Sequence, residues 1–181
     1  MAAGLKKVLY FLGTLDDQDI DWMVRNGVKR SVPAGTRIIQ EGQPTDFLFF
    51  ILAGDFSVTS GRSRAEVARL NAGEILGEIS FVDSRPPSAT VTAATDSSIG
   101  VVAVDVLERK LQTDLSFASR FYKAIAVALA DRLRARNLLG IKAAATPEAD
   151  DDMELPAHLL DTMSMAGTRF ADMQRRAWGG A

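Results

Sequence analysis

Ile75-Leu76-Gly77-Glu78-Ile79-Ser80-Phe81 opens a segment that continues as Val82-Asp83-Ser84-Arg85-Pro86-Pro87 and ends as Ser88-Ala89-Thr90-Val91-Thr92-Ala93. A glycine, an acid and an apolar turn come first, and a proline-rich bend then leads into a β-branched run. This order predicts one turn of helix beside a strand, with the helix start facing a pocket. Backbone N–H groups at a helix start lack intrahelical partners and carry the positive end of the helix dipole, so they suit an anion such as phosphate. Glu78 follows a glycine that lets a ligand approach the backbone, and its carboxylate can accept hydrogen bonds from a diol such as ribose.

Short runs rich in β-branched and aromatic residues lie before and after this segment. They recur about every ten residues and are separated by turn residues, mainly glycine, proline and asparagine. The expected strands are Lys29–Val32, Arg37–Gln40, Phe47–Leu52, Phe56–Ser60, Ala65–Leu70, Ala89–Ala94 and Ile99–Val104. Strands at this spacing predict an antiparallel sandwich or barrel.

The segment resembles the phosphate-binding cassette of cyclic nucleotide-binding domains. The matching residues are Gly77, Glu78, Ile79, Ser80, Ser88, Ala89 and Val91. A second resemblance lies upstream, where Ile38-Ile39-x-x-Gly42 precedes an apolar run and Gly54. The resemblance covers about residues 10–140 and rests on these two motifs. They imply a mainly β fold with flanking helices: a jelly-roll-like antiparallel β-barrel of the cyclic nucleotide-binding type, followed by a long C-terminal helix.

The resemblance also implies a ligand and the residues that hold it. The ligand would be cyclic AMP, cyclic GMP or another cyclic nucleotide, with no further cofactor. Gly77 and the amides after it would hold the phosphate, and Glu78 would hold the ribose. The full set of candidate ligand-binding residues is Gly77, Glu78, Ile79, Ser80, Arg85, Ser88 and Ala89.

Pro87 departs from the family pattern, because it stands where the family has its phosphate-pairing arginine. Proline supplies neither a charge nor an N–H group. Arg85 lies two residues earlier, and two readings of it stay open: its guanidinium reaches the same phosphate, or the stiff bend holds it toward solvent.

Helical periodicity predicts the flanking elements. One helix starts near Thr14-Leu15-Asp16-Asp17 and ends at Asn26-Gly27, and a short helix covers Asp105–Leu111. A longer helix, Ser116–Leu139, has an apolar surface wider than one stripe, which suggests that it meets both the barrel and a second helix. Its likeness to the corresponding helix of catabolite-activator-like regulators implies a homodimer through Ser116–Leu139.

We expect three parts in the chain. The resemblance implies a cyclic nucleotide-binding-like domain over residues 1–140, with its N-terminal helices and dimer helix, and composition predicts an acidic linker over residues 141–154. Residues 155–181 form an amphipathic tail helix. We expect the tail to dock on its own barrel or on a partner subunit; a membrane surface or an unknown protein partner is the alternative.

Several function classes lack the residues they require. The chain has no cysteine and one histidine, His158, so thiolate or histidine metal sites and catalytic triads are not expected. A net charge of −2 and the absence of a second helix-turn-helix pattern after Gly140 argue against DNA binding. The N-terminal apolar run is too short for a membrane span, and we expect a cytoplasmic, non-enzymatic protein.

Two functions remain. The first is a small-molecule-sensing regulatory module that binds a cyclic nucleotide or related phosphate ligand in the cassette. The alternative is a degenerate fold that kept the barrel, lost the ligand and serves as a dimerisation or protein-interaction module. Pro87 motivates the alternative, because losing a charged hydrogen bond costs about 1.5–3 kcal/mol, or roughly ten- to a hundred-fold in affinity.

Overall fold

The structure is a computed structural model that describes residues 11–61, 65–142 and 157–179, with the backbone alone described at 135–142 and 157–164. Residues 143–156, which include most of the expected linker at 141–154, lie outside the described residues. The elements in chain order are α2 (Asp17–Asn26), β1 (Val28–Val32), β2 (Arg37–Ile39), β3 (Phe47–Ala53), β4 (Asp55–Ser60), β5 (Ala65–Asn71), β6 (Ile75–Leu76), α3 (Glu78–Asp83), β7 (Thr90–Ala93), β8 (Ser97–Ala103), α4 (Val104–Thr113), α5 (Leu115–Lys142) and α6 (Ala157–Arg175).

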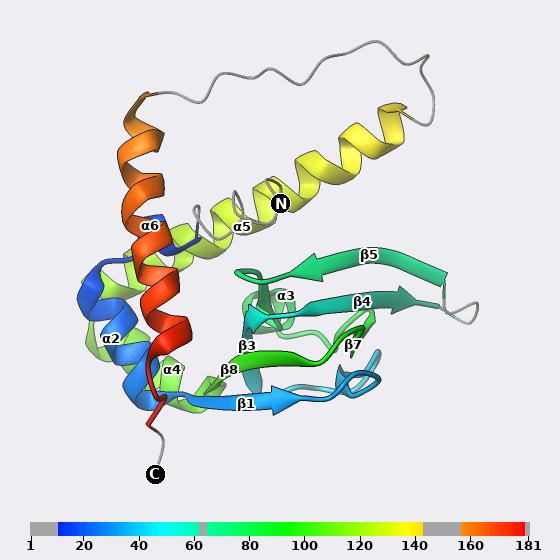
Figure 1. The fold of residues 1–181 in the computed structure, drawn as a ribbon, viewed down its shortest axis with the longest axis horizontal. Helices are drawn as coiled ribbons and strands as arrows, with labels where there is room; N and C mark the ends of the chain where they lie inside the picture. The colour runs from blue at the N-terminus through cyan, green and yellow to red at the C-terminus, as the bar shows by residue number, and fades with distance from the viewer. Residues whose placement is uncertain (1–10, 62–64, 143–156, 180–181) are drawn as a thin grey trace.

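The strands form two antiparallel four-stranded sheets (Figure 1), one in the order β1-β8-β3-β6 and the other in the order β2-β7-β4-β5. The predicted jelly-roll-like antiparallel fold is confirmed, although the described strands make two sheets rather than one closed barrel. Side chains of both sheets fill the space between them, because alternate residues of each strand point inward. This inner core includes Phe49, Ile51, Phe56, Leu76, Val91, Ile99 and Val101.

Strand β3 is buried on both faces, which explains its unbroken apolar run from Leu48 to Leu52. One set of its side chains enters the inner core, whereas Leu48, Phe50 and Leu52 point to the outer face and meet the helices. Figure 1 shows these helices, α2, α4 and α6, gathered at one end of the sandwich, with α5 running diagonally past it. The helices and the outer face of β3 therefore make a second apolar core.

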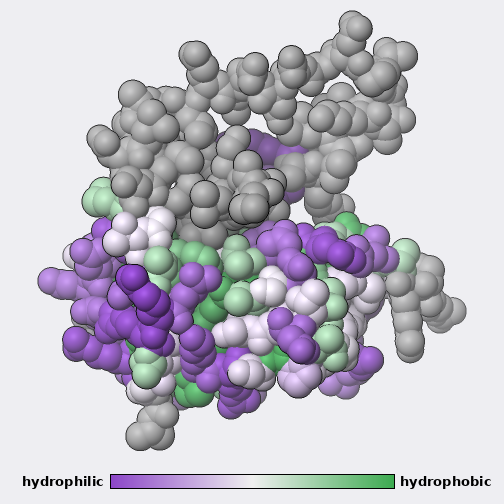
Figure 2. Space-filling model, in the orientation of Figure 1, coloured by the Kyte–Doolittle hydropathy of each residue, from purple (hydrophilic) through white to green (hydrophobic). Residues whose placement is uncertain are grey.

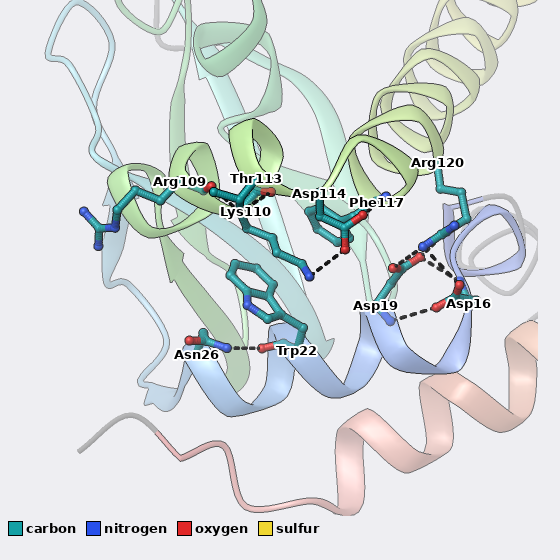
Figure 3. Close-up of polar contacts among 10 residues, drawn as sticks. All are labelled: Asp16, Asp19, Trp22, Asn26, Arg109, Lys110, Thr113, Asp114, Phe117 and Arg120. Atoms are coloured by element: carbon teal, nitrogen blue, oxygen red, sulfur yellow. Dashed lines mark hydrogen bonds and ion pairs between the residues drawn. The ribbon is translucent and has the colours of Figure 1, made fainter.

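Helix α2 begins as its sequence predicts. Asp16 and Asp19 form a capping box, in which each side chain accepts the other residue's backbone N–H at 2.9 Å. The Asp19 carboxylate is 3% exposed and also accepts two hydrogen bonds from Arg120 of α5, at 2.6 and 2.8 Å. In Figure 3 the same guanidinium reaches Asp16, 3.0 Å away. The start of α2 is thus held on α5 by a charge pair with fixed geometry.

Helix α6 packs beside α2, and ion pairs connect the two helices. Arg169 bonds Asp17 at 2.7 Å, and Arg176 pairs with Asp21. Figure 2 shows mainly hydrophilic side chains at this helical end of the molecule. Within the described part of the chain, no helix is long and apolar enough to cross a membrane.

Candidate functional site

The cassette begins with a strand that the sequence pattern did not predict. Ile75-Leu76 form β6, which pairs with Phe50 and Phe49 of β3. Gly77 then turns the chain with φ at 86°, in the left-handed region, and a Cβ there would lie 2.8 Å from the Phe47 carbonyl oxygen. Only glycine fits both requirements. The turn places Glu78 at the first position of α3, under the long helix α5.

Arg132 of α5 meets the Glu78 carboxylate in a buried ion pair. The Glu78 side chain is 2% exposed and that of Arg132 is 24% exposed. The same guanidinium donates a hydrogen bond to the Ile75 carbonyl oxygen, and its Nη2 lies 3.8 Å from Oε2 of the buried Glu74. One arginine therefore ties the carboxylate at the start of the cassette helix, and the strand before it, to α5.

Burial shifts the proton affinity of Glu78. Loss of water around the carboxyl raises the pKa of Glu78, and the neighbouring charge of Arg132 partly opposes this effect. The negative charge of Glu74 adds to the rise. The ion pair with Arg132 accordingly offsets part of the desolvation cost of the buried Glu78 carboxylate.

A small cavity adjoins this charge cluster. Its volume is about 20 Å³, room for about one water molecule. The lining residues are Phe11, Gly73, Glu74, Ile75, Ala128, Asp131 and Arg132. Within the residues that the structure describes, no group of three or more His, Asp or Glu side chains could hold a metal ion. The cluster can thus hold charge and orient a polar ligand group.

The second half of the predicted site is tied to a different part of the molecule. The Pro87 carbonyl oxygen accepts the Gly42 N–H at 2.8 Å, and the Ser88 carbonyl oxygen accepts the Ser60 hydroxyl at 3.0 Å. Contacts with the 40–43 turn and with β4 therefore hold this bend. The bend begins at Ser84, which ends α3 in the left-handed region with φ at 56°.

The candidate residues differ in exposure. Arg85 and Ser88 are exposed, Gly77, Ser80 and Ala89 are half-buried, and Ile79 is 51% exposed. The structure places Gly77–Ser80 on and before α3 and places Arg85–Ala89 in the bend that follows. Of the candidate set, Glu78 alone is buried. Its position beneath α5 distinguishes it from the other six candidates, which are half-buried or exposed.

Arg132 and Glu74 were missed as site residues. Arg132 lies on the same helical stripe as Phe117, Phe121 and Ile125. An arginine in register with apolar residues that prove to be buried is a signal for a buried anionic partner. No comparable pattern marked Glu74, which lies in a turn before β6.

Comparison with known proteins now decides the family. The family model described as "Cyclic nucleotide-binding domain" matches residues 29–114. Residues 29–114 are a cyclic nucleotide-binding domain. The domain contains both motifs noted above, and Glu78 with its bend lies inside it, whereas Arg132 lies on α5 beyond the matched range.

Curated relatives match part of this chain. The cAMP-dependent protein kinase regulatory subunit of Yarrowia lipolytica is 28% identical over 111 residues, covering 61% of this chain and 30% of that protein. A cyclic nucleotide-gated potassium channel of Rhizobium etli is 40% identical over 77 residues, covering 42% of this chain and 21% of the channel. The chain thus spans less than a third of either relative, and the two relatives share a binding domain within different whole proteins.

Solved structures support the same fold. A cyclic nucleotide-binding domain from Methylobacillus flagellatus superposes with a TM-score of 0.67 at 21% identity. The match covers 81% of this chain and 86% of that one. At this level of identity the likeness concerns the fold of the cyclic nucleotide-binding domain and carries no ligand specificity.

Proposed function

We propose that the protein is a regulatory, non-enzymatic module of the cytoplasm that senses a cyclic nucleotide or a related phosphate ligand through residues 77–89. The family of residues 29–114 supports this proposal. The observation that carries it is the position of Glu78 at the start of the cassette helix α3, where its carboxylate contacts α5 through Arg132. A ligand hydroxyl that hydrogen-bonds Glu78 would compete with or reinforce Arg132, so binding would change how α5 is held.

The proposed ligand contacts follow the family pattern as far as the residues allow. Gly77 and the amides after it would hold phosphate, with Ser80, Ser88 and Ala89 beside them, while Ile79 would supply apolar contact. Pro87 removes the charged phosphate partner. Arg85 is exposed, and its backbone N–H donates to the Asp83 carboxylate at 3.0 Å. We therefore expect weak binding.

Titration calorimetry tests this proposal. Wild-type protein binds cyclic AMP or cyclic GMP with a Kd above about 10 micromolar, because the charged phosphate contact is missing. Pro87→Arg tightens binding about tenfold by restoring a bidentate anion partner, and Glu78→Gln removes the measurable heat. Glu66→Gln is the control, since Glu66 lies on the exposed strand β5 and pairs with Arg69.

The degenerate module is the second candidate, and it is favoured by the same buried pair: Arg132 already occupies the carboxylate that a ribose would need. Absence of heat for cyclic AMP, cyclic GMP and cyclic dinucleotides, in wild type and in Pro87→Arg alike, would leave this candidate in place of the sensor.

We further propose that the protein forms a homodimer through Ser116–Leu139. The first turns of α5 are committed to the protein's own core, because Phe117, Phe121 and Ile125 are at most 2% exposed. Farther along the helix Leu133 is 60% exposed. The C-terminal part of α5 projects from the body (Figure 1). The dimer contact would therefore lie on this projecting part.

Light scattering tests the dimer. Wild-type protein has twice the chain mass at micromolar concentration, and Leu133→Glu shifts it toward the single-chain mass, since a charge is costly in an apolar helix interface. Leu115→Glu is the matched control, because Leu115 is 79% exposed at the opposite end of α5. A wild-type protein that runs at the single-chain mass contradicts the proposal.

A further inference from the structure

Trp178, just after α6, occupies a seat that two glycines create. Its ring is 7% exposed, and its indole N–H donates to the Met173 carbonyl oxygen at 3.0 Å. A Cβ on Gly100 of β8 would lie 2.2 Å from the ring, and one on Gly27 would lie 2.7 Å from it. The missing side chains of Gly27 and Gly100 thus leave the space that the ring fills.

Besides Trp178, α6 contacts the body through the partly buried Phe170 and through hydrogen bonds from Arg169 and Gln174 to the carbonyl oxygens of Leu12 and Leu52. Of its residues with described side chains, Ala166 and Met173 are the buried apolar ones. Its ion pairs reach acids at the surface: the Asp17 side chain is 85% exposed and that of Asp21 is 42% exposed. Such exposed pairs stabilise little. Gly167, with open space around its Cα, further weakens the helix. These features are typical of an element that opens at low cost.

A continuous series of aromatic rings leads from this seat to the cassette. Trp178 packs on Phe50, with ring centroids 6.4 Å apart, and Phe50 packs on Phe11 at 5.8 Å. Phe11 meets Phe121 at 5.9 Å, edge to face, and Phe121 meets Phe81 of α3 at 6.2 Å, also edge to face. Phe50 and Phe121 are buried in one core, so a displaced ring at either end leaves a gap that its neighbour must fill.

We propose that α6 and Trp178 form a reversible latch whose docking is coupled to the cassette helix α3 through Phe50, Phe11 and Phe121. Docked, the ring braces the aromatic series and holds Phe81, and with it α3, in the conformation seen here. When the Trp178 ring is released, α3 becomes looser. Because coupling is reciprocal, a ligand that reorders α3 also changes how stably α6 and Trp178 dock. Only the effect of a ligand on the latch rests on the proposed function, because the coupling between α6 and α3 requires no ligand.

The test uses Trp178 as its own reporter. The chain has two tryptophans, so Trp22→Phe leaves Trp178 as the only one. In that background Gly100→Ala adds a methyl group where the ring lies and releases it. We expect acrylamide quenching of Trp178 to rise severalfold. Amide exchange across 165–175 and across 78–83 accelerates about tenfold or more, as expected when a packed element opens.

Two further variants make the test decisive. Gly167→Ala stabilises α6 and slows exchange of its amides about fivefold, from the helix propensity difference, and slows α3 in the same direction. Trp178→Ala removes the ring without adding an atom to the sheet, and it replaces Gly100→Ala if that variant does not fold. Accelerated exchange in α3 in either release variant supports the latch.

Release of Trp178 with unchanged exchange in 78–83 overturns the coupling. A separate titration with cyclic AMP, read by Trp178 fluorescence, tests the ligand's part. If no nucleotide alters the fluorescence or produces heat, the proposed function fails while the exchange comparison still decides the latch.

Discussion

Replacing Arg132 with methionine lowers the free energy of unfolding by about 3 kcal/mol, because it leaves a buried carboxylate without its charge partner. Glu78 and Glu74 are both 2% exposed at the side chain, and Arg132 also bonds the Ile75 carbonyl oxygen. Methionine keeps most of the apolar stem, so the loss reflects charge rather than volume. Urea unfolding followed by circular dichroism measures it.

The double variant Arg132→Met, Glu78→Gln is the matched comparison. Neutralising Glu78 removes the uncompensated charge, so the double variant recovers a large part of the stability lost by Arg132→Met alone. Arg134→Met serves as a surface control, because Arg134 is exposed two residues along α5. Equal losses in the Arg132 and Arg134 variants contradict the buried ion pair.

The same variants show a pH dependence of known sign. Folding raises the pKa of Glu78 above its ordinary value of 4.5, so the native state binds more protons than the unfolded state. Its contribution to stability is therefore present at acid pH and is lost as the pH rises through the folded pKa. Without Arg132 the rise in the pKa is larger, so Arg132→Met loses less stability at about pH 5 than at about pH 8. The difference vanishes when Glu78→Gln is added.

Phe121→Ala lowers the free energy of unfolding by about 3–5 kcal/mol, the usual cost of emptying a buried aromatic site. Phe121 is fully buried and contacts the rings of Phe117, Phe81 and Phe11. It is the point where α5, α3 and the N-terminal helical turn meet. The melting temperature falls by roughly 10 °C, at 2–4 °C per kcal/mol for a chain of this size.

Two comparisons separate this effect from loss of a dimer. Leu115→Ala, at a position 79% exposed on the same helix, changes the melting temperature little. Charges at Phe121 and Ile125 together prevent folding rather than dissociate subunits, because both side chains face the protein's own core. A folded but monomeric Phe121→Ala protein with unchanged melting temperature contradicts the assignment of Phe121 to the core.

Pattern in the sequence determined much of the architecture. The ten-residue spacing of β-rich runs and glycine turns predicted the antiparallel strands, and the two motifs led to the family of residues 29–114. The start of α2 near Asp16-Asp17 and the glycine before Glu78 were also readable, since helix starts and close backbone turns are local requirements. These features depend on neighbours within a few residues, which the sequence displays directly.

The tertiary structure alone decided which of these residues meet. Ile75-Leu76 are too short to be read as a strand, and only pairing with β3 makes them one. Glu78 and Arg132 lie 54 residues apart, and periodicity on α5 placed Arg132 on a stripe without naming its partner. The seat of Trp178 exists because Gly27 and Gly100, on α2's end and on β8, come together under α6. Such contacts depend on how elements pack in three dimensions, and a one-dimensional pattern records which face of an element is apolar but not what covers that face.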